Sequence, residues 1–305
     1  MIQENTIYIS KNYLMELKAK MVHFRTFIDR PIRNKYVGRF ASKVKGQGLI
    51  FEEMDNYRLG DDIRNMNWKL TQKLSRPVVK RYTEDKERPV YLVVDQSSTM
   101  FFGSTSKMKS VVACELASIS YWSVVNNQDP VGAFVISNDG HSFIKASKSQ
   151  ARSVAILSEL ESANRKLDVS SLTNKMDVVE EALKRLRHEV RQNSLIIFIS
   201  DFLDFNEGAF TQLKLLANKN ELVLAHIVDQ NETRLPEVSN FVISNSIDEL
   251  TINSKGEKLQ NAYKENWDKH IDRLYGLCRK LSFPIFEINT HENIFTQLKQ
   301  RRFHE

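Results

Sequence analysis

The chain has only two cysteines, Cys114 and Cys278, among its 305 residues. Both lie in apolar, helix-like stretches, which favours two buried thiols in a reducing compartment over a disulfide framework. Proline and glycine are also scarce, with 6 and 10 residues, so long disordered segments are not expected. No apolar run approaches the roughly 18–20 residues needed to cross a bilayer. The start, MIQENTIYIS, has no secretory signal pattern, so a soluble cytoplasmic protein is predicted.

The signatures of common enzyme classes are missing as well. The sequence contains no Gly-x-Ser-x-Gly elbow, no His-Glu-x-x-His pair and no Walker A loop. The seven histidines are scattered along the chain, a pattern typical of surface or hydrogen-bonded histidines and not of metal ligands. These absences favour a protein that is not an enzyme.

Positive charge is present in excess and is unevenly distributed. The formal net charge is +6. Residues 1–90 carry 19 Lys and Arg against 11 Asp and Glu, whereas residues 91–305 carry 25 against 27. The excess is concentrated in 11–45, which has ten basic and two acidic residues. Such a segment can face nucleic acid, anionic lipid or an acidic protein, although a solvated surface is the simpler interpretation.

Apolar strands alternate with amphipathic helices from residue 90 onward. Strands are predicted at 90–95, 131–137, 194–200, 221–228 and 283–288, and helices at 106–126, 149–161, 176–191, 207–219, 256–281 and 292–301. Strands 90–95 and 194–200 are almost wholly apolar, as central parallel strands are. GHSFIKAS, after Asn138-Asp139, predicts an edge hairpin. The alternation predicts the α/β class, with a doubly wound, mostly parallel sheet over 89–305.

Residues 1–88 are expected to form a separate N-terminal region of helix and short strands. Apolar residues at helical spacing, Leu14, Leu17, Met21 and Phe24, predict a helix over 11–28. Farther on, the sequence predicts extended segments at 49–57 and 77–83, a turn at Gly60 and a short helix near 67–74.

Carboxylate and hydroxyl side chains follow two of the predicted central strands. Asp95 ends one strand and is followed at alternate positions by Ser97 and Thr99, and Asp201 follows the other strand. Because ligands of such sheets bind at the carboxyl ends of the strands, the two aspartates are expected to meet. Hard oxygen ligands suit Mg²⁺, Mn²⁺ or Ca²⁺. Capping of the next helix by Asp95 and Ser97 is an equally open interpretation of these residues alone.

The stretch from 46 to 100 closely resembles the signature of the bacterial "domain of unknown function 58" family. The matching residues are Gly46, Gly48, Phe51, Glu52, Tyr57, Gly60, Asp61, Asp62, Arg64, Trp68, Lys69, Asp95, Ser97, Thr99 and Met100. The second half of that family is similar to the von Willebrand factor A fold. The resemblance implies a metal-ion-dependent adhesion site on Asp95, Ser97 and Thr99, with Asp201 as the later aspartate.

The middle threonine of that adhesion site has no clean counterpart in this chain. Thr173, in DVSSLTNKMDVVEEAL, is the candidate, although the glycines that precede it in the family are missing. Counting back from Ala182-Leu183 places Asp177 there instead. The resemblance thus implies a Mg²⁺ site, or one for Mn²⁺ or Ca²⁺, that is altered in this chain or lost.

Members of the family are usually encoded beside MoxR-type AAA+ ATPases and are thought to work with them in assembling or activating other proteins. The resemblance therefore implies an adaptor or co-chaperone that binds an acidic segment of a protein ligand through the metal ion. Many relatives carry two transmembrane helices before the signature. This chain shows no such span, which predicts a soluble form.

Two rival hypotheses remain at this stage. A metal-dependent nuclease would use Asp95, Asp201 and Asp204, with the basic segment 11–45 holding nucleic acid, and its binding would weaken steeply with salt. The hydroxyl-rich loop favours the binding module, because nucleases rely on carboxylates and histidine, so nucleic acid is not the expected partner. The other rival is a metal-free scaffold that binds its partner through 11–45.

The Gly-Asp-Asp stretch has a structural and a functional interpretation. Asp61 and Asp62 beside Arg64 could form a buried ion-pair and turn network that docks the first region on the second, or they could form a second acidic site. The ordinary turn chemistry of Gly60-Asp61 favours the structural role. Trp68 is predicted to be a core or interdomain anchor.

Overall fold

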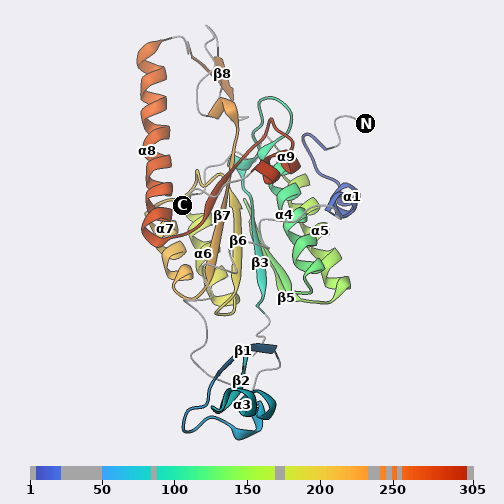
Figure 1. Ribbon diagram of the computed structural model, residues 1–305. Helices are drawn as coiled ribbons and strands as arrows, with labels where there is room; N and C mark the ends of the chain where they lie inside the picture. The colour runs from blue at the N-terminus through green and yellow to red at the C-terminus, as the bar shows by residue number, and fades with distance from the viewer. Residues whose placement is uncertain are drawn as a thin grey trace. The chain divides into compact units, whose positions relative to one another are not determined.

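The computed structural model describes residues 5–21, 50–83, 88–168, 176–232, 241–244, 249–252 and 256–300 (Figure 1). The chain divides into two compact units. The larger unit comprises Met1–Pro31 and Arg88–Glu305, and the smaller unit comprises Ile32–Glu87. Each unit has its own sheet and its own surface.

A six-stranded sheet forms the centre of the larger unit (Figure 1). Its strands, in spatial order, are β10 (Ile285–Asn289), β7 (Glu221–Val228), β6 (Leu195–Ser200), β3 (Val90–Gln96), β4 (Val131–Ser137) and β5 (Gly140–Ser147). All neighbours are parallel except β5, which forms the predicted hairpin with β4. The predicted doubly wound, mostly parallel α/β sheet is confirmed, and it is consistent with a von Willebrand factor A-like fold.

Helices cover both faces of this sheet (Figure 1). One face carries α4 (Lys109–Asn126), α5 (Gln150–Arg165) and α9 (Ile294–Gln300), and the other carries α6 (Met176–Glu189), α7 (Glu207–Ala217) and α8 (Glu257–Leu281). The seven residues of β3 are all buried, as are those of β6 and β7. The apolar runs of these strands are therefore explained by helices packed on both sides of them.

Helix α4 is buried almost all round, from Lys109 to Val124. The sheet covers one side of it, and helix α1 (Lys11–Met21) packs on it from the other. Ser118 Oγ and Trp122 Nε1 both donate to the main-chain oxygen of Leu14, at 2.8 and 3.0 Å. The sequence predicted amphipathic helices, but α4 has no polar face because α1 covers the side that would otherwise meet water.

The N-terminal helix belongs with the larger unit and not with the smaller one. Its apolar residues Leu14, Leu17 and Met21 are buried, and Tyr13 Oη donates to Glu115 Oε1 at 2.6 Å. The second segment of the larger unit begins at Arg88, and the N-terminal helix-plus-strand region 1–88 is divided between the two units. The predicted helix continuation at 22–28 lies outside the described residues.

The smaller unit contains a two-stranded antiparallel ribbon. Strand β1 (Ile50–Asn56) pairs with β2 (Val78–Thr83), and between them lie the 3₁₀ turn η2 (Ile63–Asn65) and helix α3 (Trp68–Leu74). Among the side chains that are described here, only Val78 and Val79 are buried. The predicted strands and short helix are present, but their described side chains contribute little to an apolar interior.

One hairpin was not predicted. Strands β8 (Phe241–Ser244) and β9 (Glu249–Ile252) pair with each other in an antiparallel register. They join neither of the other sheets in the described part of the chain.

Candidate functional site

The predicted aspartates lie at the carboxyl ends of adjacent strands. Asp95 ends β3, and Asp201 follows β6, and both are about 1% exposed. Val94 pairs with Ile199, so the next residues, Asp95 and Ser200, lie side by side. Ser200 Oγ donates to Asp95 Oδ2 at 2.6 Å. The expectation that the two strand ends would bring their oxygen atoms together is thus met.

The hydroxyls of the loop after β3 join this cluster. The Ser97 N–H donates to Asp95 Oδ1 at 2.9 Å, which closes a tight turn on the carboxylate. Ser97 Oγ lies 3.3 Å from Thr99 Oγ1, and Thr99 Oγ1 donates to Asp201 Oδ1 at 3.3 Å. Four of the five predicted ligand residues therefore form one continuous oxygen cluster. Thr173, the fifth, lies outside the described residues, and so does the side chain of Asp177.

The helix-capping interpretation of Asp95 and Ser97 is wrong. Helix α4 begins at Lys109, far along the chain, and its N-cap residue is Met108. Ser97 precedes the short turn η3 (Ser98–Met100) without a side-chain cap bond. The loop is instead fixed from the next strand, since the Ser98 N–H donates to Asn138 Oδ1 at 2.8 Å.

The Asp201 turn is held by its own hydrogen bonds. The Leu203 N–H donates to Asp201 Oδ1 at 3.0 Å, and the Phe202 N–H donates to Ser200 Oγ at 2.9 Å. Phe202 has a φ of +58°, a left-handed backbone that a bulky residue rarely adopts. Its ring is fully buried, which helps to hold this conformation and keeps the Asp201 carboxylate aimed at the cluster.

A lysine that was not predicted enters the same cluster. Lys109 is completely buried, and its Nζ lies 2.6 Å from Asp201 Oδ2 and also contacts Glu232 Oε1. Burial lowers the pKa of the ammonium, but the two carboxylates raise it by more, so the net shift is upward and the lysine stays charged. In the sequence, the only indication of this buried lysine is its position at the start of the largely apolar stretch KSVVACELASIS.

Burial and mutual repulsion perturb the carboxyl groups of the site. Burial raises the pKa of Asp95 to about 6, and the nearby Asp201 adds to this, while hydrogen bonds from Ser200 and Ser97 oppose it. The pKa of Asp204 is raised to about 7 by burial, by Asp201 and by Asp95. The cluster is therefore a place where additional positive charge is electrostatically favourable.

The donor set fits a hard divalent cation. Two neighbouring hydroxyls and two buried carboxylates are the oxygen ligands that Mg²⁺ accepts, directly or through water. The described residues contain no group of three or more His, Cys, Asp or Glu side chains arranged to hold a metal. An ion here would therefore depend on Ser97, Thr99 and water, and it would share Asp201 with the Lys109 ammonium.

The Gly-Asp-Asp stretch lies in the smaller unit and has turn chemistry. Gly60 has a φ of +100°, Asp61 Oδ2 accepts from the Arg58 N–H at 2.8 Å, and Asp62 Oδ1 accepts from the Arg64 N–H at 3.0 Å. These contacts form the predicted turn, but Asp62 and Arg64 are exposed, so the predicted burial of the network is wrong. Trp68 is 65% exposed, so it is not a core residue.

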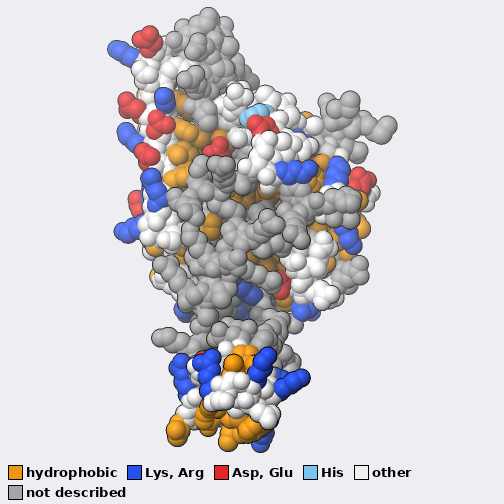
Figure 2. Space-filling model, viewed as in Figure 1, with side chains coloured by type: hydrophobic (Ala, Val, Ile, Leu, Met, Phe, Trp, Pro, Cys, Tyr) orange, Lys and Arg blue, Asp and Glu red, His pale blue; other side chains and the backbone are white. Residues whose placement is uncertain are grey.

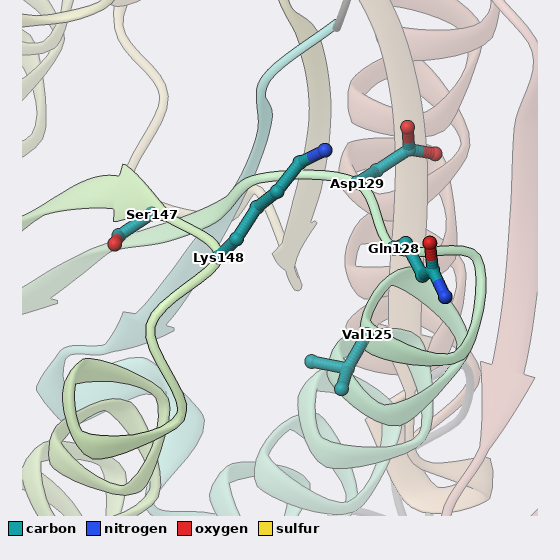
Figure 3. Close-up of a pocket in the computed structure, with 5 residues that line it drawn as sticks. All are labelled: Val125, Gln128, Asp129, Ser147 and Lys148. Atoms are coloured by element: carbon teal, nitrogen blue, oxygen red, sulfur yellow. The ribbon is translucent and has the colours of Figure 1, made fainter.

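A pocket of about 250 Å³ lies away from the oxygen cluster. It is lined by Val125, Gln128, Asp129, Ser147 and Lys148, and Lys148 extends toward Asp129 (Figure 3). These residues lie where β4 begins and β5 ends. This is the amino end of the parallel strands, and Asp95 lies at their carboxyl end. The pocket is therefore separate from the candidate site.

Within the described residues, no helix is both long enough and apolar enough to cross a membrane. Of the basic segment 11–45, the structure describes only the part within α1.

Two solved structures align with part of the chain. One is an aerotolerance-related membrane protein from Bacteroides fragilis NCTC 9343 with multiple mutations to serines, at 12% identity and a TM-score of 0.38. The other is the conserved hypothetical protein BatB from Bacteroides thetaiotaomicron, at 11% identity and a TM-score of 0.33. Each alignment covers 64% of this chain and 98% of the other. At these TM-scores neither likeness bears on function.

Curated relatives include uncharacterized proteins from Mycobacterium bovis and from two strains of Mycobacterium tuberculosis, each 24% identical over 209 residues. The alignments cover 68% of this chain and 64% of each relative, so the chain spans less than two thirds of their length. A family model described as "Protein of unknown function DUF58" matches residues 53–273. That match covers well over half of the chain and agrees with the motif resemblance, and the chain therefore belongs to the DUF58 family.

Proposed function

We propose that this protein is a metal-ion-dependent protein-binding module that serves as an adaptor for a MoxR-type AAA+ ATPase. The observation that carries the proposal is the convergence of Asp95, Ser97, Thr99 and Asp201 at the carboxyl edge of the sheet. Mg²⁺ is the expected ion, with Mn²⁺ or Ca²⁺ as substitutes. The proposal of a MoxR-type ATPase as the partner rests on the family resemblance alone.

In this proposal the hydroxyls of Ser97 and Thr99 ligate the ion directly, because they lie 3.3 Å apart and Thr99 is only partly buried. Asp95 and Asp201 hold it through water, since strong hydrogen bonds already occupy part of each carboxylate. The bound ion would present a free position to a carboxylate from an acidic segment of a partner protein.

Lys109 sets the strength of this site. Its ammonium already neutralises Asp201 and Glu232, so a divalent ion gains less from the cluster than it would from bare carboxylates. Binding of the ion alone is expected to be weak. A partner carboxylate adds negative charge beside the ion, which makes binding of ion and partner mutually dependent.

The nuclease alternative keeps one supporting observation, which is that Asp204 interacts electrostatically with Asp95 and Asp201. Three carboxylates at one edge could serve metal-dependent phosphodiester cleavage. The buried Lys109 favours the binding module, because it already compensates charge that a two-metal nuclease would need for its ions.

Calorimetric titration with Mg²⁺ and Mn²⁺ tests the proposal. Wild type should bind one ion saturably, and Ser97→Ala with Thr99→Val should weaken binding by roughly tenfold or more. Lys109→Met, which removes the competing ammonium, should tighten it. Asp139→Asn changes an exposed aspartate in the β4–β5 turn and serves as the control.

No ion binding by wild type, with or without a Glu-rich peptide, would overturn the metal dependence. Metal-dependent cleavage of DNA or RNA that is lost in Asp204→Asn would favour the nuclease instead.

A further inference from the structure

Exposed apolar side chains are concentrated in the smaller unit. Nine large hydrophobic side chains of the described residues are exposed, and five of them lie between positions 50 and 83: Met54, Leu59, Ile63, Trp68 and Leu74. Leu59 is 103% exposed, at the tip of a turn, and Trp68 is 65% exposed. A contiguous stretch of chain that turns this many large apolar groups outward is typical of an interaction surface.

Hydrogen bonds of the main chain hold these side chains in place. Asp61 closes the turn after Leu59, Asp62 caps η2 in front of Ile63, and Asn67 Oδ1 accepts from the Leu70 N–H at 3.2 Å to cap α3. The aspartates of the family signature thus fix the turns that carry the flanking apolar residues, Leu59 and Ile63. The outward placement of Leu59, Ile63 and Trp68 is built into the turn and is not the result of an unfolded loop.

Basic side chains surround this apolar surface. Between positions 58 and 76 the exposed basic residues are Arg58, Arg64, Lys69, Lys73 and Arg76. The two acidic residues of the same stretch, Asp61 and Asp62, accept main-chain hydrogen bonds. Figure 2 shows hydrophobic side chains of this unit gathered together, at the bottom of the view, beside a belt of Lys and Arg. The surface is therefore complementary to an anionic layer with an apolar interior.

We propose that this surface, Met54, Leu59, Ile63, Trp68 and Leu74 with its basic belt, docks on an anionic lipid membrane. Insertion of a few apolar side chains together with several Lys or Arg next to the headgroups suffices for reversible membrane binding. Four of the five apolar side chains project from turns or from helix α3, which suits insertion between headgroups. The proposal is independent of the metal site.

Co-sedimentation of the full chain with vesicles tests the proposal. Binding is expected to vesicles of phosphatidylcholine mixed with phosphatidylglycerol, to be weak with phosphatidylcholine alone, and to fall with added salt. Leu59→Ser with Trp68→Ser should lower the affinity by roughly tenfold or more. The matched control is Leu259→Ser, which removes an apolar side chain of 38% exposure from α8.

Tryptophan fluorescence supplies a second readout at the site itself. The chain has three tryptophans, and Trp122 is buried at 6% exposure whereas Trp68 is open to water. Anionic vesicles should shift the emission of wild type to shorter wavelength, and Trp68→Phe should lose that shift while retaining most of its binding. Circular dichroism confirms that each variant is folded.

Three results would overturn the proposal. They are no binding to the anionic vesicles, equal binding by wild type and the Leu59→Ser/Trp68→Ser variant, and an emission shift that persists in Trp68→Phe. Equal binding by the double variant would show that basic residues, and not the apolar side chains, make the lipid contact. A chain that does not bind the anionic vesicles could instead bind a purified protein saturably. If the Leu59→Ser/Trp68→Ser variant lost that binding, the surface would be assigned to a protein partner.

Discussion

The two units of this protein distribute polar and apolar groups in opposite ways. In the larger unit, charged groups are sealed inside: Lys109 and Asp201 lie beneath the surface among apolar strands and helices. In the smaller unit, apolar groups face outward, and only Val78 and Val79 are buried among its described side chains. The larger unit has the apolar area to stabilise a buried polar cluster, whereas the smaller unit depends on turns and caps for its shape.

The largest expected effect comes from removing the buried cation of the larger unit. Lys109→Met should lower the free energy of unfolding by about 3–5 kcal/mol, because Asp201 and Glu232 would then lie buried without their positive partner. Chemical denaturation at neutral pH measures this. Lys214→Met, on the exposed side of α7, is the control and should change little. A loss below about 1 kcal/mol would show that water already reaches the cluster.

The next largest effect is a loss of unfolding free energy in variants of helix α1, which should exceed the loss in variants of the smaller unit. Leu17 in α1 is completely buried, so Leu17→Ala should cost about 2–5 kcal/mol of unfolding free energy. Leu74→Ala in α3, where the side chain is 44% exposed, should cost about 0.5 kcal/mol or less. Both are measured by denaturant unfolding. Similar costs for the two variants would contradict the assignment of α1 to the larger unit.

The sequence predicted the large-scale fold because the strands of the larger unit have unambiguous patterns. The apolar runs that end at Asp95 and Ser200 identify central strands. The polar side chains that follow each run therefore lie at the carboxyl end of the sheet. Lys109 was missed because a lysine near the start of a helix is normally exposed, whereas α4 is buried almost all round. Its partner Glu232 lies 123 residues farther along the chain, and no local pattern connects the two.

The exposed surface of the smaller unit was missed for a different physical reason. A tryptophan in a short sequence motif is usually buried, and Trp68 was expected to be an anchor. Trp68 is instead 65% exposed at the start of the short helix α3. Which residues of such a small unit face outward depends on tertiary contacts that the local sequence does not encode.

A smaller expected effect is a change in folding stability with pH that is caused by Asp204. Its folded pKa of about 7 is above the usual aspartate value, since burial and the neighbouring carboxylates favour the protonated form. A group of this kind stabilises the folded state at low pH, and that stabilisation is lost as pH rises through the folded pKa. Asp204→Asn should therefore match wild type near pH 4 and become progressively more stable than wild type up to about pH 7. A stability difference that does not vary with pH would show that Asp204 is solvated.

The smallest effect compares one helix cap from each unit. Asn206 caps α7 by accepting from the Ala209 N–H at 2.7 Å, and Asn67 caps α3 in the same way. Replacing either with alanine removes about 1 kcal/mol locally. Asn206→Ala should lower global stability, because α7 is packed on the larger core through Phe210 and Leu213.

Asn67→Ala should leave the denaturation midpoint of the larger unit unchanged and should accelerate amide hydrogen exchange in α3, since little buried surface holds that helix. Exchange of the α3 amides and global unfolding of both variants are the measurements. If Asn67→Ala lowers the stability of the whole chain as much as Asn206→Ala does, the two units unfold together. The outward apolar surface would then have to be stabilised by the larger unit and not by its own turns.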